Sequence, residues 1–125
     1  MKLLDTSVAV DYLRGVTQAE ALVREHVEQA EALAASELVR FELLAGVRDD
    51  EIDALERFFS LFSWIEVEEE ITRVAGAFAR RYRAAYGGID DVDYLIGATA
   101  QVFAADLLTT NVRHFPMYPD LAAAY

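Results

Sequence analysis

Residues 1–7 read Met-Lys-Leu-Leu-Asp-Thr-Ser, and this opening stretch decides which fold the chain can adopt. An apolar run of strand type stops at Asp5, and a helical pattern begins at Val8, directly after Thr6 and Ser7. Open α/β sheets bind their ligands beyond the carboxyl ends of the strands, which is where Asp5 is expected. Two interpretations are open: one of these polar residues caps the next helix, or Asp5 belongs to a functional site.

The composition indicates one folded domain with an acidic surface. The chain has 125 residues, of which 54% are hydrophobic, so a single globular domain spanning residues 1–125 is expected. There is no apolar run long enough to span a membrane and no signal-peptide pattern, which predicts a cytoplasmic protein with no membrane partner. The absence of cysteine excludes disulfides, cysteine-bound zinc and a thiol nucleophile. The net charge of −11 disfavours non-specific binding to nucleic acid and favours a basic partner.

Strand patterns and helical patterns alternate along the rest of the chain. Thr17, Ser36 and Asp90 are of the types that cap helices, and Ile52 falls on the expected buried face of its helix. Alternation of this kind predicts a parallel sheet covered by helices on both faces, with the carboxyl ends of the strands at one edge. Strands are expected at 2–5, 31–35, 64–67 and 106–110, helices at 8–13, from 17, from 36 to about 46, from 49, at 68–86 and at 90–103, a loop at 111–114 and an irregular tail at 115–119.

Glu42 is the most informative charged residue of the chain. Its neighbours three and four positions away are apolar or small, so its carboxylate is expected to point inward. An unpaired buried carboxylate is unfavourable, and burial raises its pKa. Either an arginine, such as Arg14 or Arg40, or a metal ion must therefore offset its charge.

Three acids gather at the start of the last predicted helix. Asp90 as the cap, with Asp93 in the first turn, is the structural explanation. It accounts less well for Asp91, because three carboxylates in four positions repel one another unless a cation lies among them. Asn111 follows the last strand and lies, like Asp5, at a carboxyl end, either as a turn residue or as part of the same site.

Asp5, Glu42 and Asp93 lie on three separate elements whose ends are able to converge, and Asn111 adds an amide oxygen. Several oxygen ligands without cysteine suit Mg²⁺ or Mn²⁺. Such a site binds phosphate oxygens and activates a water, which is the chemistry of phosphodiester cleavage. These four residues are therefore the candidate catalytic residues.

The remaining polar candidates have simpler explanations beside the functional ones. His26 lies on a charged helix and is expected to be solvated, and His114 either contacts substrate or is merely exposed. Arg80, Arg81 and Arg83 form the one basic cluster, which is either a solvated helix face neutralised by nearby acids or a contact for a phosphate backbone.

Four motifs, in order and spread over essentially the whole chain, resemble the PIN domain and specifically the VapC type of toxin ribonuclease. They are Leu3-Leu-Asp-Thr-Ser7, Phe41-Glu-Leu-Leu-Ala-Gly46, Asp93-Tyr-Leu-Ile-Gly-Ala-Thr-Ala100 and Leu108-Thr-Thr-Asn-Val-Arg-His-Phe115. The resemblance implies one PIN-like domain with an α/β/α sandwich around a mostly parallel sheet of about four to five strands. It also implies a Mg²⁺- or Mn²⁺-dependent endoribonuclease that cleaves RNA and is inhibited by a cognate VapB-like antitoxin, as a homodimer or a toxin–antitoxin hetero-oligomer.

Carried over by position, Asp5, Glu42 and Asp93 would be the acidic metal ligands, and Asn111 stands where the family often has aspartate. Thr6 would orient a ligand or a water through its hydroxyl. Asp91 is an additional acid that the resemblance does not assign as a ligand.

Two other functions stay open. A non-catalytic PIN-like binding module would keep the fold without cleaving RNA, and Asn111 is the feature that favours it. A phosphoacceptor receiver domain also carries acids at strand ends, but its mechanism usually needs a lysine beside the site. The only lysine, Lys2, lies at the other end of the first strand.

Overall fold

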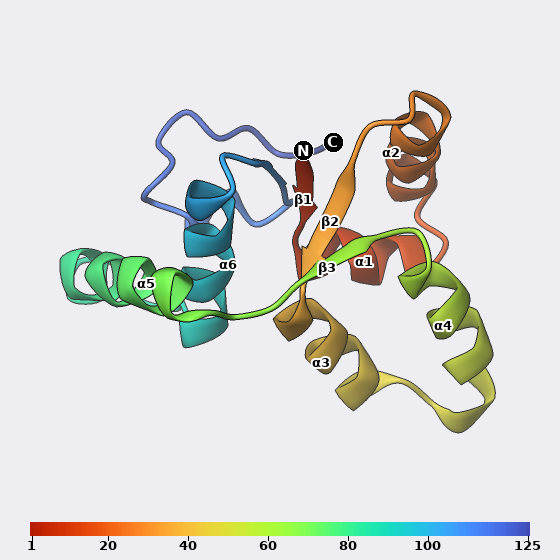
Figure 1. The fold of residues 1–125 in the computed structure, drawn as a ribbon, viewed down its shortest axis with the longest axis horizontal. Helices are drawn as coiled ribbons and strands as arrows, with labels where there is room; N and C mark the ends of the chain where they lie inside the picture. The colour runs from red at the N-terminus through yellow and green to blue at the C-terminus, as the bar shows by residue number, and fades with distance from the viewer.

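The computed structural model describes residues 1–125 and consists of four strands, six α-helices and two short 3₁₀ turns (Figure 1). The strands follow the apolar runs of the sequence, and helices or turns connect each strand to the next. The elements in chain order are β1 Lys2–Leu4, α1 Thr6–Leu13, α2 Thr17–Glu28, β2 Leu33–Ser36, α3 Glu37–Gly46, η1 Asp49–Glu51, α4 Ile52–Phe59, β3 Ser63–Ile65, α5 Glu69–Tyr82, α6 Asp91–Val102, β4 Asp106–Leu108 and η2 Val112–His114.

The four strands form one parallel sheet in the order β3-β2-β1-β4. β1 is paired on both sides, with Leu3 opposite Ala34 of β2 and Leu107 of β4. Because all four strands run in the same direction, their carboxyl ends lie at one edge of the sheet. Asp5 therefore stands at this edge between the ends of β2 and β4.

The direction of the connections decides which helices cover which face. The chain steps one way across the sheet from β1 to β2 and β3, and steps back across it from β3 to β4. Right-handed crossovers then place α1 to α4 on one face and α5 and α6 on the other. Figure 1 shows this arrangement, with α5 packed against α6 and α1 against α2 and α3. The predicted α/β/α fold is confirmed.

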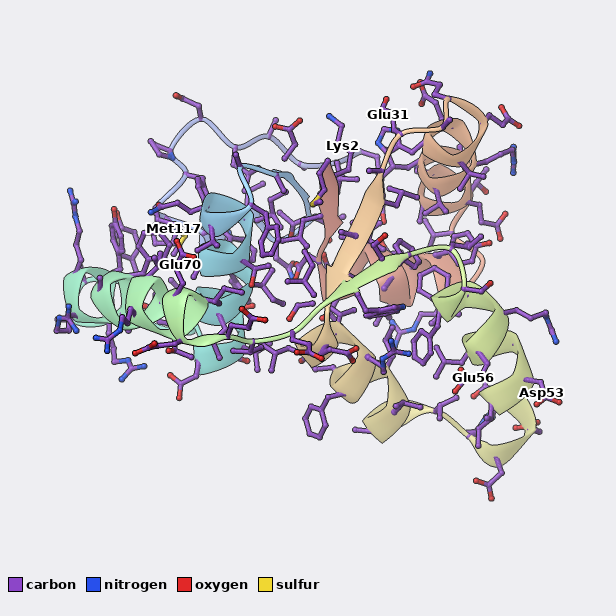
Figure 2. All side chains as sticks on the ribbon, in the orientation of Figure 1. Lys2, Glu31, Asp53, Glu56, Glu70 and Met117 are labelled. Atoms are coloured by element: carbon purple, nitrogen blue, oxygen red, sulfur yellow. The ribbon has the colours of Figure 1, made fainter.

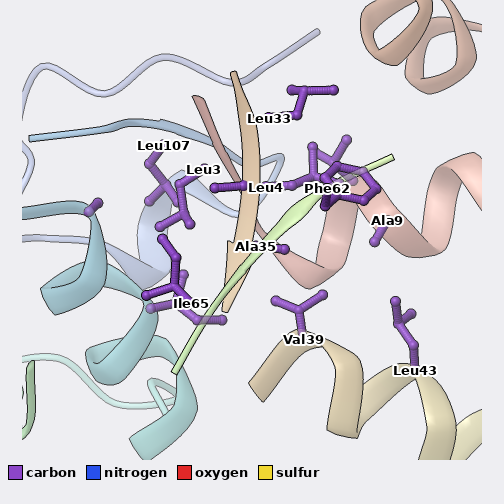
Figure 3. Packing of buried hydrophobic residues seen from close by; sticks show 14 of the residues in the cluster. Leu3, Leu4, Ala9, Leu33, Ala35, Val39, Leu43, Phe62, Ile65 and Leu107 are labelled. Carbon is purple, nitrogen blue, oxygen red and sulfur yellow. The ribbon is translucent and has the colours of Figure 1, made fainter. Parts of the chain in front are cut away.

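The hydrophobic core occupies both faces of the sheet, because successive strand residues point to opposite sides. Leu3 and Leu107 share the face that α6 covers, whereas Leu4 points to the face of α1 (Figure 3). Twenty-four buried hydrophobic residues form a single cluster, to which helices on both faces contribute. The central strand is thus fixed from both sides, which holds Asp5 in one position.

Several predicted elements are shorter than expected at their carboxyl ends. β3 ends at Ile65 and β4 at Leu108, not at residues 67 and 110, because only these shorter segments pair with a neighbouring strand. α5 ends at Tyr82, not at residue 86, because the next residues form turn hydrogen bonds back to its carbonyl. The predicted loop at 111–114 contains the 3₁₀ turn η2, and the helix expected from residue 49 begins as the turn η1.

Other predictions about single residues are wrong. α1 begins at Thr6 and not at Val8. Thr17 is the first residue inside α2 and does not cap it. Ile52 is 38% exposed, so it does not lie on the buried face of α4. The two ring nitrogens of His26 are buried without a hydrogen-bond partner, so this histidine is not solvated.

The surface carries the excess acidic charge. Figure 2 shows Asp53 and Glu56 on α4 and Glu70 at the start of α5. Lys2, at the amino end of β1, pairs with Asp106 of β4 at 2.9 Å. None of the helices combines the length and apolar character that a membrane crossing requires.

Candidate active site

A polar cavity of about 400 Å³ opens at the carboxyl edge of the sheet. Residues from α1, α3, the start of α6 and the segment after β4 meet there, although they lie far apart in the sequence. Val10 is the only hydrophobic residue of its lining. The lining residues are Asp5, Thr6, Ser7, Val10, Asp11, Glu42, Asp90, Asp93, Thr110, Asn111 and His114. All four candidate catalytic residues are therefore brought together.

Asp5 is buried and occupies the N-cap position of α1, but its side chain makes no capping hydrogen bond. Its Oδ2 accepts hydrogen bonds from Thr109 Oγ1 at 2.7 Å and from Ser7 Oγ at 3.1 Å. The capping interpretation of Asp5 is therefore wrong. The carboxylate is oriented by hydroxyl groups toward the cavity.

The two hydroxyl groups are themselves held by the backbone that follows β4. The N–H of Asn111 donates to Thr109 Oγ1 at 2.9 Å, and the N–H of Thr110 donates to Ser7 Oγ at 3.1 Å. Each hydroxyl thus accepts from an amide and has its own proton free for Asp5, and such chains of hydrogen bonds strengthen one another. The sequence suggested Ser7 only as a candidate helix cap, and it suggested no role for Thr109. The two adjacent threonines before Asn111, Thr109 and Thr110, were the feature of the sequence that could have indicated hydroxyl donors at this edge of the sheet.

Glu42 projects from α3 into the same cavity and is half-buried. Its Oε1 accepts a hydrogen bond from Thr6 Oγ1 at 2.7 Å, so Thr6 orients this carboxylate. Burial raises the pKa of Glu42, and the nearby charges of Asp90 and Asp5 raise it further. The inward orientation predicted for Glu42 is confirmed.

No basic side chain lies within 4 Å of the Glu42 carboxylate, which rules out the first of the two alternatives, an ion pair with an arginine. Arg40 pairs instead with Glu37 at 2.6 Å, one turn away on the same helix, and its guanidinium lies 4.1 Å from the centre of the Trp64 ring. The charge of Arg40 is therefore already paired with Glu37 and stacked on Trp64, and it is not available to Glu42. The charge of Glu42 is left without a protein counter-ion.

Asp93 forms a reciprocal cap with Asp90 at the start of α6. The N–H of Asp93 donates to Asp90 Oδ1 at 3.2 Å, and the N–H of Asp90 donates to Asp93 Oδ2 at 3.3 Å. The same Oδ2 lies 3.1 Å from His114 Nδ1. Burial, followed by the charge of Asp90, raises the pKa of Asp93 to about 6. Asp93 is therefore both a helix-capping residue and a carboxylate of the cavity.

The neighbouring acids divide between the cavity and the surface. Asp90 lines the cavity, whereas the Asp91 side chain is 82% exposed and pairs with Arg83. At least one arginine of the basic cluster is therefore neutralised by an acid, as the simpler explanation predicted. Asn111 lines the cavity from the turn after β4, and Asp11 lines it from α1. Sequence analysis did not single out Asp11.

The three carboxylates share one pattern of hydrogen bonding. In Asp5, Glu42 and Asp93 one oxygen accepts hydrogen bonds from a hydroxyl or a backbone amide, and the other makes no hydrogen bond within the protein. No three His, Asp or Glu side chains are close enough together to hold a metal in the present arrangement. The donor set nevertheless fits a divalent cation, because three free carboxylate oxygens without any cysteine suit Mg²⁺ or Mn²⁺.

Comparison with known proteins identifies the family of the chain. The family model named PIN domain matches residues 2–119. The chain is 62% identical over 125 residues to "Ribonuclease VapC19" of Mycobacterium tuberculosis, and the match covers 100% of both chains.

Solved structures of other proteins share the fold. A toxin–antitoxin complex from Klebsiella pneumoniae contains a chain that superposes with a TM-score of 0.79 at 24% identity, covering 100% of this chain and 98% of that one. VapBC-1 from nontypeable Haemophilus influenzae gives a TM-score of 0.78 at 25% identity, covering 98% of this chain and 95% of that one.

Proposed function

The chain belongs to the PIN domain family, among its VapC ribonucleases, and from this membership we propose that it is a metal-dependent endoribonuclease. It would act on RNA in the cytoplasm as the toxin of a type II toxin–antitoxin pair. The chain spans the full length of its ribonuclease relative, so the proposal concerns one PIN domain made of residues 1–125.

The observation that carries the proposal is the shared pattern of the three carboxylates. Asp5, Glu42 and Asp93 each have one oxygen held by the protein and one left free, and all line one cavity. Such an arrangement is unfavourable without a counter-ion, because burial and mutual repulsion raise the pKa of Glu42 and Asp93. A divalent cation bound at the free oxygens would relieve this repulsion.

The residues that line the cavity would have different roles in binding the metal. Asp5, Glu42 and Asp93 would hold Mg²⁺ or Mn²⁺, and Asn111 would offer an amide oxygen without adding negative charge. The bound metal would activate a water and neutralise charge on the phosphodiester. The protein's own contribution is rigidity, since the hydroxyl groups of Thr109 and Ser7 hold Asp5 and the reciprocal cap with Asp90 holds Asp93.

We propose a basic, VapB-like antitoxin as the protein partner. The solved structures that share this fold include a toxin–antitoxin complex, and the net charge of −11 suits rapid association with a basic chain. The same charge opposes the approach of RNA. Binding of RNA would therefore depend on the metal and on a few arginines.

The receiver-domain alternative finds no support in the structure. Lys2, the only lysine, is bound to Asp106 at the amino ends of β1 and β4, on the edge of the sheet opposite the cavity. A non-catalytic binding module remains the competing hypothesis, because its fold would be the same.

The test is cleavage of total cellular RNA by the purified protein, freed of any copurified antitoxin. Mn²⁺, EDTA, Asp93→Asn and Asp91→Asn are compared in parallel. Asp91 is a matched control, because it is an acid two positions away that faces solvent. A few discrete cuts, lost with EDTA and with Asp93→Asn but kept with Asp91→Asn, are expected. An absence of cleavage, with thermal stability unchanged by Mn²⁺, would establish the binding module instead.

A further inference from the structure

We propose that His114 is a positioning residue that orients Asp93 for the cation, an inference that rests on the proposed function. His114 is the only histidine, lysine or arginine among the residues that line the cavity. His114 contacts the carboxylate of Asp93 and no other acid of the cavity, so a substitution of His114 would change the orientation of Asp93 alone.

The contact selects one oxygen of Asp93. His114 Nδ1 lies 3.1 Å from Oδ2, and the N–H of Asp90 donates to the same oxygen at 3.3 Å. A backbone amide that donates a hydrogen bond and an imidazole nitrogen in close contact, from different segments, therefore lie against Oδ2, and Oδ1 makes no hydrogen bond. An unprotonated ring nitrogen would be repelled by a carboxylate oxygen at this distance, so the positioning role requires a proton on Nδ1. Rotation of the carboxylate would break both contacts, and Oδ1 is thus the oxygen presented to the cavity.

The turn that carries His114 is itself firmly attached. In η2 the N–H of His114 donates to the carbonyl of Asn111 at 2.9 Å, and the next residue, Phe115, is fully buried in the core. The imidazole therefore links α6 to the segment after β4. It fixes Asp93 relative to Asn111, two residues that the sequence separates by a whole helix and strand.

The test compares three substitutions by their Mn²⁺ affinity, measured calorimetrically on purified protein, with RNA cleavage in parallel. His114→Ala removes the imidazole that contacts Asp93, and the Mn²⁺ affinity is expected to fall about 10-fold or more, in the range found for residues that orient metal ligands. The amide nitrogen of His114→Asn stands near the position of Nδ1 and is expected to restore affinity to within about 3-fold. The amide of His114→Gln stands near Nε2 and is expected not to restore it.

A second measurement needs no metal. The chain has only two histidines, so nitrogen-15 spectra of the imidazoles are assigned with His26→Gln as the control. A proton on Nδ1 of His114 is expected, and a ring protonated on Nε2 alone would overturn the inference.

The outcomes separate the two proposals. Wild-type affinity in His114→Ala, or rescue by His114→Gln and not by His114→Asn, would overturn the positioning role and leave the ribonuclease intact. A wild-type protein that neither binds Mn²⁺ nor cleaves RNA would overturn both. His114 is 40% exposed, so the variants are expected to fold, which Trp64 fluorescence verifies.

Discussion

The raised pKa of Asp93 predicts that Asp93→Asn stabilises the metal-free protein at pH 8. In the folded state burial and the charge of Asp90 raise the pKa of this carboxyl to about 6, from an ordinary value of 3.8. Below about pH 4 both states hold the proton. Between pH 4 and 6 the unfolded chain ionises first, so stability falls as the pH rises, and the loss is complete above the folded pKa. Asparagine does not ionise and escapes this loss.

The magnitude follows from the two values. A difference of about 2 pKa units at 1.36 kcal/mol each gives roughly 3 kcal/mol as an upper limit. The Asp93 side chain is 15% exposed in an open cavity, so solvent reduces the effect and about 1–2 kcal/mol is expected. An unfolding entropy of about 2.1 cal/mol/K per residue gives about 0.26 kcal/mol/K for 125 residues. The expected rise in Tm is therefore about 4–8 °C.

The assay is thermal unfolding in EDTA at pH 4 and pH 8, followed by the fluorescence of Trp64, the only tryptophan. At pH 4 the variant and the wild type are expected to agree within about 0.5 kcal/mol. Asp91→Asn, which removes an exposed acid, is the control and is expected to change stability by less than about 0.5 kcal/mol. A destabilised Asp93→Asn at pH 8, or an equal gain at both pH values, would refute the electrostatic reasoning.

Three further predictions concern the residues that support the site and the fold. Thr109→Val keeps the shape of the side chain but removes the hydroxyl that donates to Asp5. It is expected to destabilise the protein by about 1–3 kcal/mol in chemical denaturation and to weaken RNA cleavage. Arg40→Ala loses the stacking on Trp64, and an expected loss of about 1–2 kcal/mol is read from denaturation together with a shift in tryptophan emission. Tyr118→Phe removes a hydrogen bond to a carbonyl of α6, so Tm is expected to fall by an amount equivalent to about 1 kcal/mol while RNA cleavage stays at the wild-type rate.

The alternation of strands and helices could be predicted from the sequence, and the parallel sheet followed from it. The capping role of Ser36 and the reciprocal position of Asp90 at the start of α6 were also predictable, because caps depend on residues close in sequence. Element ends were predicted less well. β4 stops at Leu108 because strand length depends on pairing with β1, which local patterns do not contain.

The convergence of Asp5, Glu42 and Asp93 was also predictable from the sequence, since the carboxyl ends of parallel strands meet at one edge of the sheet. Only the tertiary structure decided what each carboxylate touches. Thr109 reaches Asp5 across 104 positions of sequence, and His114 reaches Asp93 from the segment beyond the next strand. Periodicity predicts which face a side chain lies on, but its hydrogen-bond partner depends on side-chain rotamers and on the packing of distant segments, and these exist only in the folded chain.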